Sequence, residues 1–229
     1  MTGLIDYSET VPIQYQNGYE IFMGREFHVD PRVFIPRPET VLLVREVISR
    51  LDISLNRKTS ILDLCTGSGV VAVSLACELE QCRVIAADIS SEALEVAGSN
   101  IALHGVGDRV STLCSDIYNG IPSSFEGMFD VVVSNPPYVS ERDYGMLDAW
   151  VRAEPEMALL SGPEGMDHIL RIVRGGGRYL KPGGFLALET GYDQAQKVSR
   201  LLTQTGYASV NVIGDHNGIE RIVSGVKNG

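Results

Sequence analysis

The sequence predicts an α/β protein with a Rossmann-like, seven-stranded and mostly parallel sheet whose last strand is antiparallel. From residue 59 onward, short apolar runs alternate with helix-like stretches, which is typical of a parallel sheet covered by helices. The run FDVVVS at 129–134 has the apolar character of a strand that is buried on both faces. The last two apolar runs have no recognisable helix between them, so we expect an antiparallel hairpin through residues 214–218.

The expected elements follow one another along residues 59–229, which we take as one domain. Strands are expected at 60–64, 83–88, 109–114, 129–134, 184–189, 208–213 and 220–226. Helical patterns lie between them at 70–79, 91–103, 165–180 and 193–205. Ser91, with Glu92 and Glu95 in the first turn, favours a helix start at that point.

Residues 1–58 follow another pattern, and we expect a small appendage packed on the larger domain. The stretch IQYQNGYEIFMGREFHVD alternates around Asn17 and Gly18, a dipeptide typical of hairpin turns. Prolines then keep PRVFIPRPET extended. A helix is expected over 39–51, with an apolar face formed by Val41, Val44, Val47, Ile48 and Leu51.

Composition limits the possible classes of protein. The 229 residues carry a formal charge of −10, which argues against a broad electrostatic grip on duplex nucleic acid. No apolar run approaches the ~18 residues that a membrane helix needs. The first ten residues lack the basic-then-apolar order of a signal peptide, so we expect a cytoplasmic protein without a membrane partner. Cys65, Cys77, Cys82 and Cys114 form no C-x-x-C pair, which favours reduced, mostly buried thiols and no metal site.

A glycine-rich turn is expected between the first strand of the large domain and the helix after it. The turn reads Cys65, Thr66, Gly67, Ser68 and Gly69. Its two glycines allow the backbone to approach a ligand closely, and the helix start offers free N–H groups. About 20 residues later, Asp88 ends the next strand, where an acidic side chain accepts hydrogen bonds from ribose hydroxyls. Strand, glycines, helix, strand and acid in this order predict a nucleotide-type cofactor.

Two features favour S-adenosylmethionine over NAD as that cofactor. Asp63 lies on the strand just before the glycines, where it could hold the amino group of a methionine moiety. Asp116 follows the third strand, where it or its neighbour Ile117 could face an adenine; a strand-end cap is the alternative for Asp116. A seven-stranded sheet with an antiparallel last strand is also the fold of most class I S-adenosylmethionine-dependent methyltransferases.

The sequence Asn135, Pro136, Pro137, Tyr138 ends the buried strand at 129–134. Ligands of open α/β sheets lie outside the carboxyl ends of the strands, so these residues are expected beside the glycine-rich turn. The prolines stiffen the backbone, which leaves the side-chain oxygen of Asn135 and the carbonyl of Pro136 as two fixed acceptors. Two acceptors hold a planar –NH2 group by both hydrogens, and Tyr138 adds a flat face for stacking. We therefore expect Asn135, Pro136 and Tyr138 to act in catalysis and all four residues to bind substrate.

This arrangement predicts methyl transfer to an sp2 nitrogen by orientation and charge stabilisation, without a strong base. Candidate targets are the amide of glutamine and the exocyclic amines of adenine, guanine or cytosine. A non-catalytic binding subunit is a further alternative, disfavoured by the intact glycines and the intact Asn-Pro-Pro-Tyr sequence.

Six motifs carry a resemblance to a known family. They are FIPRPET, DLCTGSG, AADIS, FDVVVSNPPYVS, EPEMALLSGPEGMDHILRIV and GGFLALETGYDQ. In this order they resemble the bacterial N5-glutamine methyltransferases of peptide chain release factors (the HemK/PrmC family), over roughly residues 20 to 225.

The resemblance implies that residues 59–229 are the methyltransferase catalytic domain. It also implies S-adenosylmethionine as cofactor, with S-adenosylhomocysteine as product, and a release factor as the protein partner. Asn135 would hold the cofactor as well as the glutamine of a Gly-Gly-Gln loop. Members usually carry an N-terminal helical domain that this chain is expected to lack. A ribosomal-protein glutamine, a small molecule or a nucleobase therefore stays open as the alternative substrate.

Overall fold

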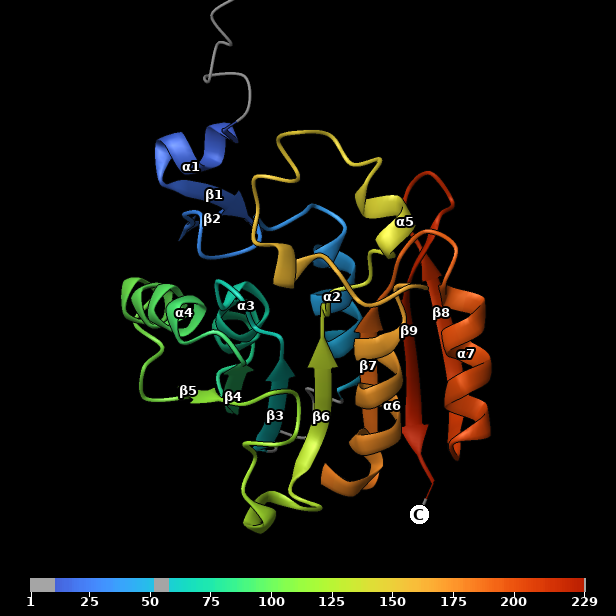
Figure 1. The fold of residues 1–229 in the computed structure, drawn as a ribbon. Helices are drawn as coiled ribbons and strands as arrows, with labels where there is room; N and C mark the ends of the chain where they lie inside the picture. The colour runs from blue at the N-terminus through green and yellow to red at the C-terminus, as the bar shows by residue number, and fades with distance from the viewer. Residues whose placement is uncertain (1–10, 52–57, 229) are drawn as a thin grey trace, which may run out of the picture.

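The computed structural model describes residues 11–51 and 58–228, and its centre is a seven-stranded sheet (Figure 1). The strands are β3 (Thr59–Leu64), β4 (Cys82–Asp88), β5 (Val110–Cys114), β6 (Phe129–Ser134), β7 (Leu180–Glu189), β8 (Tyr207–Gly214) and β9 (Glu220–Lys227). Their order in the sheet is β5-β4-β3-β6-β7-β9-β8. Only β9 runs against its neighbours, β7 and β8, which confirms the predicted class I methyltransferase topology.

Helices cover both faces of this sheet. They are α2 (Thr40–Arg50), α3 (Val70–Glu78), α4 (Ser91–Leu103), α6 (Asp167–Tyr179) and α7 (Ala195–Gln204), whereas the short helix α5 (Glu141–Tyr144) lies beyond the carboxyl ends of the strands (Figure 1). One hydrophobic cluster joins α2 and α3 to one face, and a second joins α6 and α7 to the other. The six residues of β6 are all buried between these layers, and each apolar side chain there contributes about 1.5–3 kcal/mol.

The helix predicted over 39–51 is confirmed as α2, although its buried face differs in detail. Leu43, Val44 and Val47 are fully buried, whereas Val41 and Ile48 are partly buried at the edge of the same cluster. The burial of Leu43 follows from the docking of α2 against α3 and the sheet. An isolated helical pattern cannot specify which part of its apolar stripe faces the deepest layer.

The predicted hairpin turn at Asn17 and Gly18 is wrong. Residues Ile13–Asn17 form a short helix, α1, and Gly18 ends it in the left-handed conformation, with φ of 81°. The hairpin lies one step later: β1 (Tyr19–Phe22) pairs with β2 (Arg25–His28) around Met23 and Gly24. Both turn residues have positive φ, 49° and 75°, as a tight type I′ turn requires. Asn-Gly serves helix ends as well as hairpins, because both sites need a left-handed residue.

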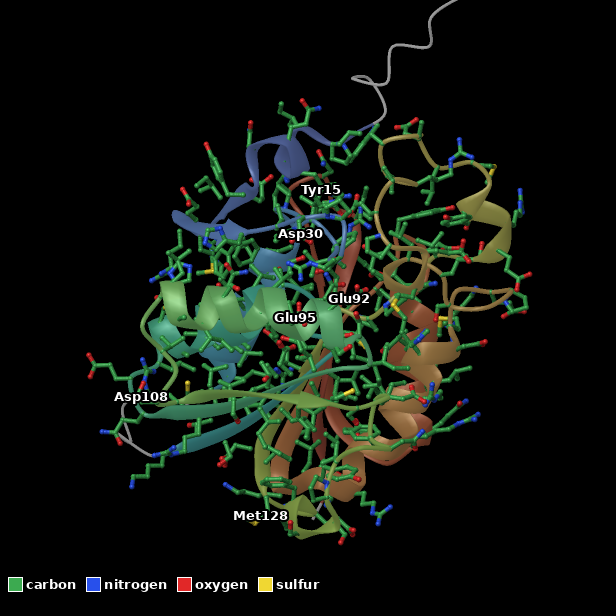
Figure 2. The ribbon with its side chains drawn as sticks, turned by 60° about the vertical axis from the view of Figure 1, so that its left-hand side comes forward. Tyr15, Asp30, Glu92, Glu95, Asp108 and Met128 are labelled. Carbon is green, nitrogen blue, oxygen red and sulfur yellow. The ribbon has the colours of Figure 1, made fainter. Side chains whose placement is uncertain are left out.

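The amino-terminal segment rests on α4, above the carboxyl ends of the parallel strands (Figures 1 and 2). Figure 2 shows Asp30 close to Glu92 and Glu95 of α4. Arg32 bridges this contact, with ion pairs of 2.7 Å to Asp30 and 2.8 Å to Glu95. Phe27 shares the core cluster of α2, α3 and the sheet. The division of the chain at residue 58 stays a prediction.

One strand of the carboxyl half starts at another residue than expected. β7 begins at Leu180, four residues before the predicted start, because Leu180 already pairs with Phe129 of β6. The register then shifts before Val131 pairs with Phe185, so the intervening Lys-Pro-Gly-Gly sequence forms an irregularity inside the strand. The predicted hairpin of the last two strands is confirmed as β8 and β9.

Over residues 11–51 and 58–228, no helix is long and apolar enough to cross a membrane. In the same ranges, no group of three or more His, Cys, Asp or Glu side chains could hold a metal ion. The four cysteines are free thiols; Cys82 is buried, but Cys114 is exposed, contrary to the expectation of mostly buried thiols.

Candidate active site

A cavity of about 290 Å³ opens at the carboxyl ends of the parallel strands. It lies where β3 and β6 are neighbours and the order of the strands reverses, which is where open α/β sheets bind ligands. Twelve of the thirteen predicted site residues line it. They are Asp63, Cys65, Thr66, Gly67, Ser68, Asp88, Asp116, Ile117, Asn135, Pro136, Pro137 and Tyr138. The structure thus brings the two predicted motifs into one cavity.

The turn after β3 is built from residues with left-handed backbone. Cys65 has φ of 57° and Gly67 has φ of 54°. A Cβ atom built on Gly67 would meet nothing within 4 Å, so the backbone there faces open space. The N–H of Thr66 donates to Ala87 O of β4 at 3.0 Å, which ties the turn to the neighbouring strand. Backbone that faces the cavity in this way can contact a ligand directly.

Asp88 connects this turn to the start of α4. Its carboxylate accepts hydrogen bonds from the N–H groups of Gly67, at 2.8 Å, and Ser90, at 3.0 Å. Burial raises the pKa of Asp88, while these backbone donors oppose the shift. Each carboxylate oxygen has a second lone pair, so Asp88 can accept further hydrogen bonds from a ligand in the cavity.

Asp63 is 1% exposed and lies on the floor of the cavity. The hydroxyl of Thr66 donates to its Oδ2 at 2.6 Å. Burial raises the pKa of Asp63 to about 7, because desolvation outweighs the hydrogen bond from Thr66. A cationic ligand beside this carboxyl would favour its charged form.

Gly69 does not line the cavity. It ends the turn with φ of 79° and begins α3. A Cβ atom at this position would lie 3.2 Å from Cβ of Ala97 in α4, closer than an ordinary contact. The absence of a side chain at Gly69 therefore allows α3 and α4 to approach each other, and the helix pair in turn supports the loop.

Asp116 and Ile117 stand at the end of the cavity next to β5. Arg171 of α6 donates to Asp116 Oδ2 at 2.7 Å, and this hydrogen bond lowers the pKa of Asp116. Ile117 is 4% exposed and has φ of 53°. The hydroxyl of Ser115 donates to the carbonyl of Ile117 at 2.8 Å and accepts from the N–H of Gly120. These two hydrogen bonds fix the loop that contains Ile117.

Asn135 follows β6, which lies across from β3 at the point where the order of the strands reverses. Its Nδ2 atom donates to the hydroxyl of Thr40 at 3.2 Å. Among the described residues, none donates a hydrogen bond to Asn135 Oδ1, which leaves this oxygen available as an acceptor. The side chain of Tyr138 is mostly buried, and burial raises its pKa. Its hydroxyl lies 3.4 Å from Glu189 Oε1.

Three residues behind Asn135 and Tyr138 were not predicted as site residues. Thr40 begins α2, Glu189 ends β7, and Gln194 precedes α7. Gln194 Nε2 donates to Tyr138 O at 2.9 Å and to Gly165 O at 3.1 Å. One signal in the sequence could have identified Glu189: it ends the strand next to β6, so its carboxyl reaches the same edge of the sheet as Asn135.

Two segments that are far apart in the sequence meet at the mouth of the cavity. Arg37 forms an ion pair with Glu154, whose Oε2 also accepts from the N–H of Ile35 at 2.9 Å. The guanidinium of Arg37 lies over the rings of Phe34, at 4.7 Å, and Trp150, at 5.3 Å. Glu154 is buried, and Trp150 is 42% exposed at the rim.

Comparisons with known proteins find methyltransferases. The family model of the methyltransferase small domain matches residues 40–157. The chain is 39% identical over 218 residues to a release factor glutamine methyltransferase of Chlorobaculum tepidum, which covers 93% of this chain and 74% of the relative. It is 41% identical over 212 residues to the release factor glutamine methyltransferase of Moorella thermoacetica, covering 92% and 73%.

Solved structures support the fold. A methyltransferase from Pyrococcus furiosus has a TM-score of 0.66 at 22% identity, covering 90% of this chain and 91% of the other. A ribosomal protein L11 methylase from Lactobacillus delbrueckii subsp. bulgaricus has a TM-score of 0.63 at 19% identity, covering 92% and 90%. At these identities the likeness concerns the fold alone. The two relatives above reach well beyond 30% identity over most of their length, and on that ground the chain belongs to the release factor glutamine methyltransferase family.

Proposed function

We propose that the protein transfers a methyl group from S-adenosylmethionine to the side-chain amide nitrogen of a glutamine in a peptide chain release factor. The observation that carries this proposal is the meeting of the glycine-rich turn and the Asn-Pro-Pro-Tyr sequence in one cavity. Relatives at 39% and 41% identity are named release factor glutamine methyltransferases.

The residues of the cavity fit S-adenosylmethionine. Asp63 offers a carboxylate to the ammonium group of the methionine part, and its burial in the cavity floor makes a cationic partner favourable. Asp88 would accept from the ribose hydroxyls. Ile117, buried beside Asp116, offers an apolar surface to the adenine. Cys65, Thr66, Gly67 and Ser68 would surround the middle of the cofactor, whereas Gly69 supports the loop from behind.

When bound, the cofactor supplies an electrophilic methyl group on a positively charged sulfur. The residues of this chain orient the amide that receives it. Asn135 Oδ1 and the carbonyl of Pro136 accept the two amide hydrogens, which turns the nitrogen lone pair toward the methyl carbon. The same two oxygens stabilise the positive charge that develops on nitrogen. Tyr138 stacks on the planar amide, and the surplus proton leaves to water after transfer.

A release factor is proposed as the partner, with its glutamine on a Gly-Gly-Gln loop narrow enough to enter the cavity. Arg37, Trp150 and Phe34 form part of the rim that such a loop would cross. The cytoplasmic location and the absence of direct duplex nucleic-acid binding stay predictions from the sequence. Residues 59–229 are proposed as the catalytic domain, with the amino-terminal segment as its appendage.

Methyl transfer to a purified bacterial release factor tests the proposal. The full chain is incubated with S-adenosylmethionine and the release factor, and peptide mass spectrometry locates any added methyl group. Calorimetry on the same preparation measures cofactor binding. A control release factor with Gly-Gly-Asn in place of Gly-Gly-Gln keeps an amide but shortens its reach.

One methyl group on the Gly-Gly-Gln glutamine, and none on the control, is the expected result. Bound cofactor with an unmodified release factor would contradict the proposed substrate, and would turn the search to another planar nitrogen. No cofactor binding would contradict the proposed chemistry itself.

A further inference from the structure

A continuous row of polar side chains lies behind the amide of Asn135. Asn135 Nδ2 donates to Thr40 Oγ1 at 3.2 Å. The Thr40 side chain in turn lies near the carboxyl of Glu189 and favours its charged form. Glu189 Oε1 also lies 3.4 Å from the hydroxyl of Tyr138. Both side chains proposed to contact the substrate amide therefore lead back to one carboxyl group.

Glu189 is an unusual residue to find at this depth. It is 2% exposed, and its Oε2 atom has no hydrogen-bond partner among the described residues. A buried carboxyl with an unsatisfied oxygen costs free energy, so packing alone does not account for it. It is not one of the residues that line the cavity. Its neighbour Tyr138 does line the cavity.

The direction of the hydrogen bonds gives this carboxyl a specific effect. A carboxylate can only accept, so it draws the Thr40 proton toward itself. The lone pairs of Thr40 then face Asn135, and only the –NH2 end of the Asn135 amide can point at them. The two ends of an amide are nearly equal in size, so hydrogen-bond partners rather than packing decide which end faces which way.

We propose that Glu189, acting through Thr40, is a positioning residue that fixes the amide orientation of Asn135 and so presents Oδ1 to the substrate. The reverse orientation would place an –NH2 group against the –NH2 group of the substrate amide. The inference rests on the proposed amide methylation, because it concerns how an acceptor for an amide hydrogen is held.

Replacement of Glu189 by Gln tests the direction of the hydrogen bonds between Glu189, Thr40 and Asn135. The glutamine amide can donate to Thr40, which allows the hydroxyl to turn toward Asn135 Oδ1 and the Asn135 amide to rotate. We expect kcat to fall about 100-fold at pH 8, the size of effect that follows loss of one oriented polar group. Cofactor affinity is expected to stay that of the wild type, since Glu189 lies outside the cavity, and the fold is expected to persist because glutamine has nearly the same size as glutamate.

Thr40 offers a second test with matched controls. Thr40→Val removes the hydroxyl at nearly constant volume and is expected to lower kcat similarly, whereas Thr40→Ser keeps the hydroxyl and is expected to restore it. Thr190→Val is the control for the loss of a buried hydroxyl. Thr190 is fully buried beside Glu189, but its hydroxyl donates to Arg221 O at 3.3 Å, outside the row. We expect the Thr190 variant to keep wild-type kcat.

A pH profile adds a measurement that a merely structural role would not change. Burial, with the charge of Glu39 as a smaller contribution, raises the pKa of Glu189 to about 7, while Thr40, Arg221 and Tyr138 favour its charged form. A protonated Glu189 can donate to Thr40, which reverses the direction of the hydrogen bonds that lead to Asn135. At saturating cofactor, wild-type kcat is therefore expected to rise as the pH increases from 6 to 8, as Glu189 ionises. The rise is expected to be absent in Glu189→Gln.

Each outcome distinguishes this inference from the proposed function. A wild-type enzyme that leaves the release factor unmethylated contradicts the proposed function. An active wild type, with Glu189→Gln or Thr40→Val at the same kcat, overturns the inference, and so does a Thr40→Ser variant as slow as Thr40→Val. Loss of kcat in the first two variants alone, with unchanged cofactor affinity, supports it.

Discussion

Gly69 offers a prediction whose size can be worked from the structure. Alanine at this position must adopt the left-handed backbone, with φ of 79°, and must place its Cβ 3.2 Å from Cβ of Ala97. The backbone term costs about 1–2 kcal/mol. Crowding one methyl group into a packed contact costs about 1 kcal/mol more. We therefore expect Gly69→Ala to reduce the free energy of unfolding by about 2–3 kcal/mol.

Gly105→Ala is the matched control for the backbone term. Gly105 has φ of 64°, but a Cβ atom there meets nothing within 4 Å, so the expected loss is about 1–2 kcal/mol. Gly98 lies within α4 and also faces open space. Alanine at Gly98 is expected to stabilise the protein by about 0.5–1 kcal/mol, since it lowers the entropy of the unfolded chain.

Urea denaturation measures all three variants. With an m-value of about 2–3 kcal/mol/M, the midpoint of Gly69→Ala should lie about 0.3–0.5 M below that of Gly105→Ala. Cofactor affinity, measured by calorimetry, should fall in Gly69→Ala only, because separation of α3 from α4 moves the turn that lines the cavity. Equal midpoints and equal affinities in these two variants would refute the role assigned to the contact with Ala97.

Three further predictions concern the cavity. Asn135→Ala is expected to lower kcat about 100- to 1,000-fold at saturating cofactor while the fold persists, because one of two oriented acceptors is lost. Cofactor affinity is expected to rise as the pH increases from 6 to 8, since Asp63 has a pKa of about 7 and holds an ammonium group only when charged; Asp63→Asn should remove this dependence in calorimetry. Iodoacetamide is expected to modify the exposed Cys114 before Cys65, whose pKa burial raises, as followed by peptide mass spectrometry.

Each of these has an outcome that contradicts it. Unchanged turnover in Asn135→Ala would remove that residue from the proposed mechanism. A pH dependence that persists in Asp63→Asn would assign the titration to another group. Faster alkylation of Cys65 than of Cys114 would mean that the turn after β3 opens in solution.

The sequence by itself determined the sheet and the location of the site, because both follow from local patterns. Periodicity identified the buried strand β6, and the rule for carboxyl ends placed Asn135 near the glycine-rich turn. The first hairpin was misplaced at Asn17, since the same dipeptide suits a helix end and a tight turn. The choice between them depended on residues that pair only in the folded chain.

Only the tertiary structure decided what lies behind and around the site. Glu154 meets Arg37 across 117 positions of the sequence, and Asn135 meets Thr40 across 95. The sequence places Gly69 in the ligand loop, whereas in the structure its missing side chain allows α3 to pack on α4. A single sequence carries no periodic signal for such pairs, because each is set by how helices and strands distant in the chain are brought together. Residues that contact a ligand can be identified in the sequence because they lie at the ends of strands. The residues that hold them in place are determined by the packing of the whole fold.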